Sequence, residues 1–414
     1  MPIDKDLLER IQQNRYTEPC FAEPTLLLIG DDQNDPDNML TDEDVALLAK
    51  ALQHNTQIRK LELDGNNISD AGAEILAALS RECPSFESLS IIGNQITAKG
   101  AAALAKSLFK KIDLGANPIG DGVGQLALAP RLKELGADEC QVTDEGARQL
   151  FNSKTLTLID LSTNKITGSC LEGLASTNGV LERLILCQNK SLQGQYLRFL
   201  VHSKAPAYLD LTNVRIDEQG ASYLAQSQSL QELILIGCFI KDPVAIALSQ
   251  SRVKRMVLAS NWITDRGGIA LLHNPYYLYL NLRGNRALTS EFTQNALKRD
   301  YQTGENNLFT RTEEYRQALL KKPSLNTALA NSNHQATNAS APSSSSSSNH
   351  ENASLNGATF TPHLNGKQPK AGGKRSAEEQ LTPVPDEPAQ LVRTEENELQ
   401  KKHRPNFLGN NNSN

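Results

Sequence analysis

The sequence predicts an α/β solenoid with a parallel inner sheet and outer helices, and three observations support this prediction. The apolar pattern L-x-L-x-x-N-x-I recurs along the chain at a nearly fixed spacing. The alternating part of the pattern has the period of a β-strand, so both leucines point to one side. A helix-start signature follows several copies, and apolar residues at helical spacing come after it. Units of this size bury their apolar faces only by stacking on neighbouring units.

The repeat is first clean at Leu61–Ile68. The first apolar position of each copy is Leu61, Leu89, Ile112, Leu135, Ile159, Leu184, Leu209, Leu233, Met256 and Leu280. Successive copies therefore start 28, 23, 23, 24, 25, 25, 24, 23 and 24 residues apart. A period in this range, with this consensus, is the signature of a leucine-rich repeat.

An asparagine ends the strand in most copies. Its side-chain amide can bond backbone groups of the turn, which would otherwise be buried and unpaired against the next repeat. Cys140 and Cys238 take this position in two copies, as the consensus permits. Val214 takes it in a third, and because valine cannot donate a hydrogen bond we expect a looser turn there.

A Ser/Thr-Asp-x-Gly signature follows the last apolar residue of several repeats, as in 69–72, 143–146 and 264–267. Serine or threonine followed by aspartate is typical of a helix start, and the glycine suits a close approach of helix and strand. The helices expected next include Ala73–Leu79, Ala147–Phe151 and Ile269–Leu272. These starts resemble the ribonuclease-inhibitor-like class of leucine-rich repeats, over roughly residues 25 to 300. The resemblance implies a horseshoe-shaped leucine-rich-repeat solenoid.

Residues 1–55 are expected to form an N-terminal cap and a divergent first repeat, because a solenoid end exposes apolar core unless something covers it. Within this segment, 4–14 predicts an amphipathic helix, and 26–31 resembles a strand with its turn. Thr41 is expected to cap a helix that runs to about Leu52. The acidic loop that contains Asp31, Asp32, Asp35 and Asp37 lacks the glycine and glutamate of a calcium loop, so a solvated loop is expected.

The solenoid is predicted over residues 56–289, and C-terminal capping helices over 290–322. The two expected helices are Ser290–Lys298 and Glu313–Lys321. Residues 323–414 are dominated by polar, glycine and proline residues and include six consecutive serines. Such a segment cannot bury enough apolar surface to fold alone, so it is predicted to be disordered.

The composition argues against several classes of function. A net charge of −5 and a pI near 5.9 argue against nucleic acid as the main partner. No apolar run is long enough for a membrane-spanning helix, and the first residues lack the features of a secretory signal. None of the six cysteines forms a C-x-x-C pair, so neither a metal nor another cofactor is expected. We expect a monomer with reduced thiols.

No pattern for catalysis stands out. The histidines are scattered among helical segments, and no phosphate-cradling G-x-x-x-x-G-K-[ST] motif occurs. The chain is therefore predicted to bind a protein rather than to be an enzyme. Similar repeats occur in Ran GTPase-activating proteins, and this resemblance implies an alternative. In that alternative an asparagine or arginine on a repeat turn completes the active site of a small GTPase.

The non-leucine strand positions are expected to form one exposed concave surface, acidic in its N-terminal half. In the C-terminal half this surface gathers Ile185, Ile234, Ile236 and Val257, with rim residues Tyr208, Tyr279, Arg183 and Arg255. An exposed apolar patch with tyrosine and arginine at its rim is typical of a protein interface. The alternative is that these residues only reflect the preference of β-branched side chains for strands.

An aromatic pair is predicted on the edge of the solenoid. Phe239 and Trp262 occupy the same place in successive repeats, just after the asparagine position, and Arg215 and Arg286 flank them. Tryptophan and arginine are enriched at interface hot spots, so this edge is a second candidate for partner binding. Mutual burial of the two rings is the alternative, and the sequence leaves open which surface is the main interface.

The C-terminal tail points to a biological setting. Its acidic residues are Glu378, Glu379, Asp386, Glu387, Glu395, Glu396 and Glu398. A basic run follows at 401–404, and then Phe407-Leu408. This arrangement resembles the translocation signals of effectors that bacteria export through type IV secretion systems. The resemblance implies secretion into the host cytoplasm, with a host protein or another effector as the partner. A cytoplasmic location is the alternative.

Overall fold

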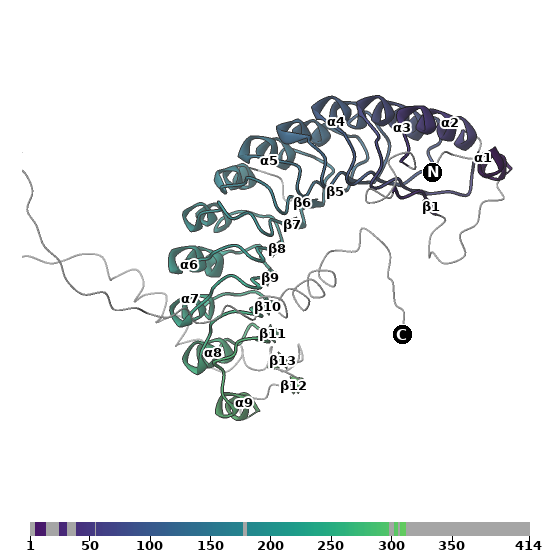
Figure 1. The fold of residues 1–414 in the computed structure, drawn as a ribbon. Helices are drawn as coiled ribbons and strands as arrows, with labels where there is room; N and C mark the ends of the chain where they lie inside the picture. The colour runs from purple at the N-terminus through teal and green to yellow at the C-terminus, as the bar shows by residue number, and fades with distance from the viewer. Residues whose placement is uncertain are drawn as a thin grey trace, which may run out of the picture. The chain divides into compact units, whose positions relative to one another are not determined.

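The structure is a computed structural model that describes residues 5–13, 25–30, 39–53, 55–176, 180–297, 302–304 and 307–311. The acidic loop, the second predicted capping helix and the tail with its predicted signal lie outside these residues. In the described part the strands lie side by side along the inner side of the solenoid and the helices along its outer side (Figure 1). The predicted leucine-rich-repeat solenoid is confirmed.

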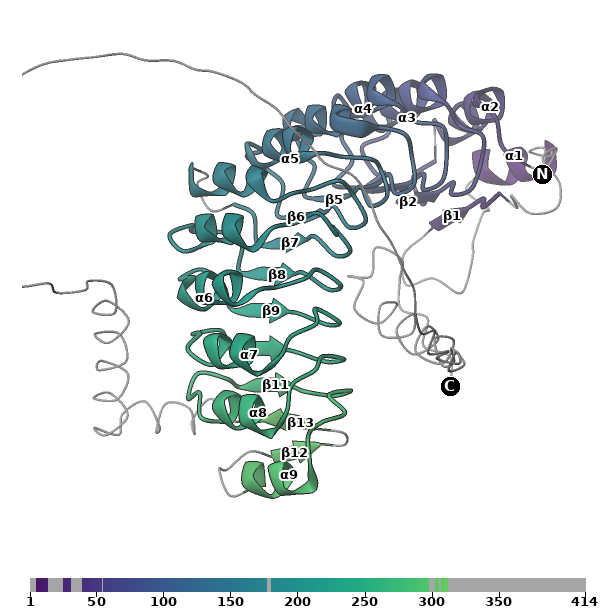
Figure 2. The same cartoon turned by 60° about the vertical axis from the view of Figure 1, so that its left-hand side comes forward.

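The strands form a single sheet of thirteen in the order β1 to β11, then β13 and β12. They are β1 (Thr25–Leu27), β2 (Lys60–Glu62), β3 (Ser88–Ser90), β4 (Lys111–Asp113), β5 (Glu134–Gly136), β6 (Leu158–Asp160), β7 (Arg183–Ile185), β8 (Tyr208–Asp210), β9 (Glu232–Ile234), β10 (Arg255–Val257), β11 (Tyr279–Asn281), β12 (Gln302–Gly304) and β13 (Leu308–Thr310). Strands β1 to β11 pair in parallel with their sequence neighbours, and Figure 2 shows successive arrows pointing the same way.

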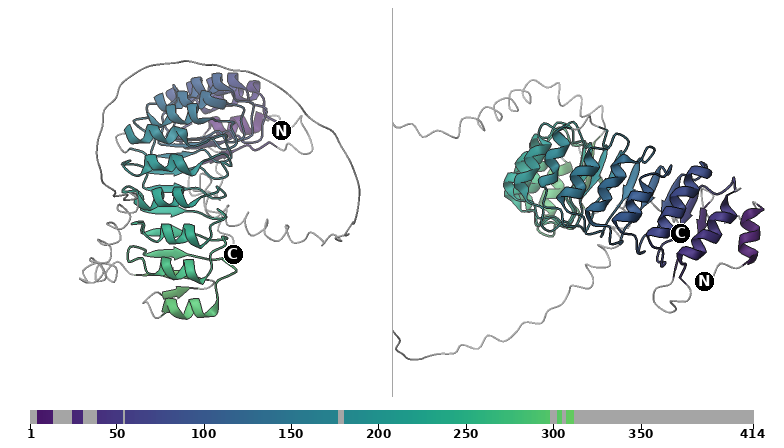
Figure 3. Two further views of the ribbon diagram at one scale, coloured as in Figure 1. Left: turned by 90° about the vertical axis from the view of Figure 1, so that its left-hand side faces the viewer. Right: turned by 90° about the horizontal axis from the view of Figure 1, so that it is seen from above.

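Helices of successive repeats stack in chain order on the outer side (Figure 3). The α-helices are α1 (Lys5–Gln12), α2 (Asp42–Leu52), α3 (Asp70–Glu82), α4 (Ala98–Leu104), α5 (Asp144–Phe151), α6 (Glu218–Gln226), α7 (Asp242–Leu248), α8 (Asp265–Leu272) and α9 (Ser290–Leu297). Among the described residues, three repeats carry 3-10 helices instead, namely η2 (Gly120–Leu128), η3 (Ser169–Ser176) and η4 (Gly194–Leu200). Neither η2 nor η4 has a side-chain hydrogen bond at its N-cap, whereas the α-helices with a serine or threonine start do.

The asparagines form a ladder that links each repeat to the one before it. Asn164 is representative, because its Nδ2 donates to the Ala137 carbonyl oxygen at 2.8 Å and its Oδ1 accepts from the Val142 amide at 2.9 Å. The Sγ atoms of Cys140 and Cys238 donate to the equivalent carbonyls at 3.1 Å. The predicted role of this position is confirmed, and it serves the neighbouring repeat as well as its own turn.

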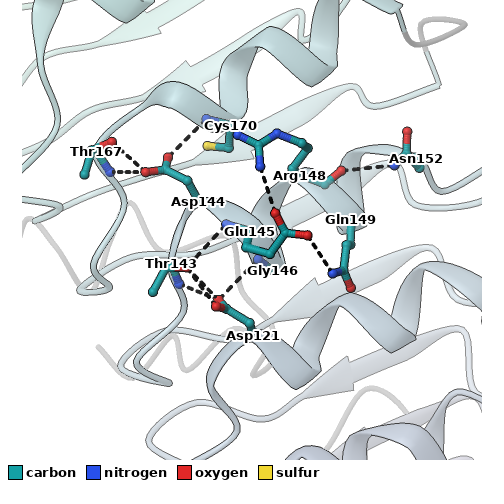
Figure 4. A network of polar contacts seen from close by, with 10 residues as sticks. All are labelled: Asp121, Thr143, Asp144, Glu145, Gly146, Arg148, Gln149, Asn152, Thr167 and Cys170. Atoms are coloured by element: carbon teal, nitrogen blue, oxygen red, sulfur yellow. Dashed lines mark hydrogen bonds and ion pairs between the residues drawn. The ribbon is translucent and has the colours of Figure 1, made fainter.

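A second ladder runs along the helix starts and was not foreseen. In Figure 4 the Asp121 carboxylate accepts hydrogen bonds from the Thr143 amide and hydroxyl and from the Gly146 amide, all of the next repeat. Asp144 bonds Thr167 in the same way. A Cβ at Gly146 would lie 2.9 Å from Asp121 Oδ1, so glycine leaves room for the carboxylate of the preceding repeat. The close approach expected at this glycine is to that carboxylate rather than to a strand.

The two ends of the solenoid differ in construction. At the N-terminal end, Ile11 of α1 is fully buried, and Asn55 Nδ2 donates to its carbonyl oxygen at 2.9 Å. At the C-terminal end α9 follows the last repeat as predicted, but β13 then pairs antiparallel to β11 and to β12. This hairpin was not predicted, because residues 301–307 are mostly polar and show no alternation of apolar and polar residues. Phe309 of β13 is fully buried and closes that end of the core.

Candidate functional site

The inner face of the sheet is built by the residues between and beside the buried leucines. In β9, Leu233 is fully buried in the main core, as is Leu235 just after the strand, whereas Ile234 lies on the opposite side. Ile234 aligns with Asp210 of β8 and Val257 of β10. Equivalent inner-face side chains of successive repeats therefore form columns, and the predicted register is confirmed.

The apolar residues of the inner face form a cluster of their own, separate from the main core. Its members are Ile185, Tyr208, Ile234, Ile236, Val257 and Ala259, with Cys187 and Tyr279 packed against it. We refer to these residues as the inner cluster. The prediction that Ile185, Ile234, Ile236 and Val257 face solvent is wrong, because they are 3%, 2%, 7% and 0% exposed.

The physical reason is the close spacing of parallel strands. Neighbouring strands lie about 4.8 Å apart, so β-branched side chains in adjacent columns touch over much of their surface. Aromatic neighbours add to this burial, since Tyr208 is only 7% exposed. Whether these residues bind a partner stays a prediction. Because they are buried, a partner would first contact the side chains around them.

Two arginines lie over the tyrosines of the inner cluster. Arg183 Cζ is 3.8 Å from the centroid of the Tyr208 ring, and Arg255 Cζ is 3.8 Å from that of Tyr279. Arg255 Nε lies 2.7 Å from Glu232 Oε1. Stacked guanidinium groups keep their other donors free for carboxylates. Half-buried Arg183, Arg255 and Tyr279 thus present polar, orientated groups at this part of the inner face.

The N-terminal and central parts of the inner face carry carboxylates. Burial raises the pKa of Asp113 to about 7, and the nearby Asp138 carboxylate adds to the effect. Burial raises the pKa of Asp160 to about 6, although a hydrogen bond from the Ser162 hydroxyl acts in the opposite direction. The pKa of Asp64 is also raised, mainly by burial. These carboxylates are held where the charged form is unfavourable.

Two glycines make room for the carboxylates. A Cβ at Gly136 would lie 2.6 Å from Asp113 Oδ1, and one at Gly115 would lie 2.5 Å from Asp138 Oδ1. The acidic groups are thus packed against the backbones of neighbouring repeats. Because the Asp138 and Asp160 carboxylates help to raise the pKa of Asp113 by charge repulsion, a cationic group brought by a partner would be favoured there.

The edge of the solenoid holds the predicted aromatic pair. The ring centroids of Phe239 and Trp262 are 5.4 Å apart at an interplanar angle of 82°. The two residues are 55% and 57% exposed, which contradicts the alternative of mutual burial. Lys241 Nζ lies 5.5 Å from the centroid of the Trp262 ring. Arg215 and Arg286 were predicted beside the pair, but Lys165 and Lys190, which share the same column, were not.

The five cysteines that the structure describes give no sign of nucleophilic chemistry. The thiols of Cys83, Cys140, Cys170, Cys187 and Cys238 are free. Burial raises the pKa of Cys140 to about 12 and raises the pKa of Cys187 well above its usual value. Thiols in this state are protonated at neutral pH and react slowly. Within the described residues no group of three or more histidine, cysteine, aspartate or glutamate side chains is placed to hold a metal ion, and no helix has the length and apolar character to cross a membrane.

Comparison with known proteins relates the chain to other leucine-rich-repeat proteins. A family model described as "Leucine Rich repeat" matches residues 54–77, 82–105 and 253–272. The chain is 26% identical over 264 residues to ribonuclease inhibitor of Sus scrofa, and the aligned region covers 54% of this chain and 57% of that protein. It is 25% identical over 253 residues to human NACHT, LRR and PYD domains-containing protein 14, which covers 53% of this chain and 23% of that protein.

A solved structure of an internalin from Listeria monocytogenes aligns with a TM-score of 0.43 and 18% identity, over 70% of this chain and 84% of that one. The chain matches just over half the length of the first of these curated relatives and about a quarter of the second. The similarity therefore concerns the repeats, and leucine-rich-repeat domains typically mediate protein–protein interaction.

Proposed function

We propose that the chain is a non-catalytic leucine-rich-repeat module, an adaptor or inhibitor, that binds a protein partner on the inner face of its sheet. The observation that carries the proposal is the sorting of that face by chemistry. One part presents carboxylates around Asp113, Asp138 and Asp160, and the other presents Arg183 and Arg255 stacked on tyrosines. One of the relatives is, by its name, an inhibitor of an enzyme: ribonuclease inhibitor of Sus scrofa.

The partner that fits this face is a folded protein with a basic patch. Its lysines or arginines would relieve the repulsion between the inner-face carboxylates, which favours a fast, salt-sensitive association. Arg183 and Arg255 would hydrogen-bond the acidic or carbonyl groups beside that patch. The buried isoleucines of the inner cluster would support these side chains from below rather than touch the partner first.

Affinity capture with the full chain tests this proposal, followed by calorimetry with the purified partner. Glu134 is the first residue of β5, and its carboxylate lies 3.1 Å from Lys111 Nζ. We expect Asp138→Lys combined with Glu134→Lys to weaken binding at least about tenfold, since charge complementarity is reversed. Lys99→Ala, on the exposed surface of α4, is the matched control and should bind as the wild type does. A partner that binds both variants equally well would show that the inner face is not the interface.

A regulator of a small GTPase is the alternative within the same fold. The ladder asparagines are poor candidates to enter a GTPase site, since Asn117 and Asn189 are 1% and 0% exposed. Arg215 and Arg286 lie exposed on repeat turns and suit that role better. GTP-hydrolysis rates measured with a panel of GTPases decide the matter: unchanged rates leave only the binding function.

The setting we propose is that of an effector translocated by a type IV secretion system into the host cytoplasm. Its support is the acidic and basic pattern of residues 378–408. Deleting residues 330–414 should abolish export of a reporter fusion while leaving the melting temperature unchanged. Unimpaired export would contradict the effector role and favour a cytoplasmic protein with the same binding function.

A further inference from the structure

The column that follows the asparagine ladder carries an unusual run in its C-terminal half. The run consists of Lys165, Lys190, Arg215, Phe239, Trp262 and Arg286, one residue from each of six successive repeats, and all six are exposed. We refer to it as the edge column. The equivalent residues of the four preceding repeats are Asn67, Gln95, Pro118 and Gln141, which carry no charge.

The backbone of Phe239 adopts a conformation that does not require a phenylalanine. Phe239 has a φ of 59°, in the left-handed region that bulky residues rarely adopt. Gln141 has a φ of 63° at the equivalent place of the other repeat in which cysteine replaces asparagine. The turn with cysteine thus imposes this conformation, and a glutamine satisfies it. An exposed phenylalanine there combines backbone strain with a solvated ring, a combination found at functional sites.

Trp262 makes the phenylalanine part of a larger apolar surface. The edge-to-face contact between the two rings occupies one side of each, and both rings remain more than half exposed. The pair is large, rigid and orientated before any partner arrives. Such aromatic side chains lose little conformational freedom on binding and are enriched at interface hot spots.

The cations of the edge column are available for a ligand. Lys165, Lys190 and Arg215 form no ion pair with any described residue, and the same holds for Arg286. Asp242 and Asp265 accept hydrogen bonds from the helix starts of the next repeat. Asp217, two residues after Arg215, accepts one from the Gly220 amide of its own helix. The column therefore offers positive charge on both sides of an apolar centre.

We propose that the edge column is a docking strip for an extended acidic peptide segment of a partner protein. One aromatic or aliphatic side chain of the segment packs on Phe239 and Trp262, and carboxylates on either side of it meet the lysines and arginines. Five steps of about 4.8 Å between strands span about 24 Å, which an extended peptide covers with roughly seven residues. This surface is distinct from the inner face, so the two can succeed or fail independently.

Single-stranded nucleic acid fits the strip less well. Base stacking needs ring faces that lie open in series, whereas these two rings meet edge to face. Asp217 lies two residues after Arg215 and is exposed. Its carboxylate would repel a nucleic-acid backbone, which has a phosphate at every nucleotide, more than it would repel a peptide whose carboxylates are separated. The chain as a whole carries a net charge of −5.

Fluorescence of Trp262, the single tryptophan of the chain, provides a direct test with the full-length protein. The probe is a peptide of glutamates around one central leucine. We expect a saturable blue shift of the emission, and at least about tenfold weaker binding when the leucine becomes serine or the glutamates become glutamine. Absence of a shift at millimolar peptide would overturn the proposal, as would tighter binding of an oligothymidylate.

Three variants locate the site. Phe239→Gly removes the ring and suits the left-handed backbone, so it should weaken peptide binding at least about tenfold while the melting temperature stays close to that of the wild type. Gln141→Gly makes the same backbone change in the other cysteine turn and should bind the peptide normally. Lys190→Glu with Arg215→Glu should abolish the salt dependence of binding. Equal binding by wild type and Phe239→Gly would assign the peptide to another surface.

Discussion

Two regions of the same repeat differ in the solvent exposure of their apolar side chains. Ile234 and Ile236 of the inner cluster are 2% and 7% exposed, although their place in the repeat is on the open face of the sheet. Phe239 follows three residues later and is 55% exposed. Position in the repeat alone therefore does not decide whether a side chain meets solvent.

The difference comes from what the neighbouring repeats supply. The column of Ile234 continues as Val257 in β10, and the arginine–tyrosine pairs lie beside it, so apolar surface is covered from several sides. The column of Phe239 supplies one aromatic neighbour, Trp262, and otherwise lysine and arginine. An apolar side chain in this solenoid is buried by the neighbouring side chains of its column, so the inner cluster contributes to stability, whereas the two rings of the edge column stay exposed.

The largest expected effect breaks the inner cluster. Ile234→Asp combined with Ile236→Asp should lower the free energy of unfolding by on the order of 5 kcal/mol, because two carboxylates would replace buried apolar groups. Chemical denaturation measures the loss, and hydrogen exchange should first rise in the repeats around β9.

Ile236→Val is the control for this variant. It keeps the site apolar and should cost about 1 kcal/mol. A double aspartate variant as stable as the wild type would place these isoleucines in solvent and restore them as a partner-binding surface.

The asparagine ladder offers the next largest effect. Asn164→Ala removes the donor to the Ala137 carbonyl and the acceptor of the Cys140 and Val142 amides. Leaving half-buried backbone groups unpaired should cost about 3 kcal/mol. Hydrogen exchange should increase first in the two repeats that the side chain joins. Lys165→Ala, on the same turn but exposed, is the control, and equal losses in both variants would argue against the ladder.

The buried carboxylates should make stability depend on pH. The folded-state pKa of Asp113, about 7, lies above the ordinary value of 3.8, so the native state binds the proton more tightly. The free energy of unfolding should therefore fall as the pH rises from about 4 to about 7, and level off above that. Asp160 acts in the same direction with a pKa of about 6. The lowered pKa values of Asp70 and Asp144 matter only in more acidic solution.

Asp113→Asn tests this account of the inner face. The variant should be more stable than the wild type at pH 8 by about 2 kcal/mol and should have a flatter profile between pH 4 and 7. Thermal melts across this range measure both quantities. A variant that is less stable at pH 8 would mean that the ionised carboxylate is favourable where it lies.

The smallest effect belongs to the edge. Phe239→Gly relieves the left-handed backbone but loses an aromatic contact worth about 0.5–1.5 kcal/mol, so the net change should stay below about 1 kcal/mol. A calorimetric melt beside that of Gln141→Gly measures it. A loss several times larger would show that the ring pair belongs to the core.

Much of the fold could be predicted because the sequence pattern of each repeat indicates the register of its strand. Leu233 and Leu235 fix which strand residues face the core, and the asparagines mark where each strand ends. The β12–β13 hairpin could not be predicted, since its pairing depends on an edge of β11 that only the folded repeats create. The 3-10 helices also escaped prediction, although the missing capping residues at η2 and η4 were visible in the sequence.

The sequence predicted where the residues of the candidate sites lie in the repeats, but it predicted their burial and their neighbours only in part. The sequence placed Arg183 and Arg255 beside Tyr208 and Tyr279, but their stacking on the rings was not predicted. The burial of Ile185 and its neighbours did not, because exposure depends on side-chain packing across several strands. The raised pKa of Asp113 likewise depends on burial and on Asp138, which belongs to the next repeat.

The measurement that tests the central claim most directly is quenching of the Trp262 fluorescence in the full-length native protein. An indole that is 57% exposed, with the Lys241 ammonium 5.5 Å from its ring centroid, should emit nearly as free tryptophan does in water and should be quenched efficiently by iodide. Unfolding should change the emission maximum little. A blue-shifted emission that iodide does not quench, and that shifts to the red on unfolding, would contradict the claim that the edge is open for binding.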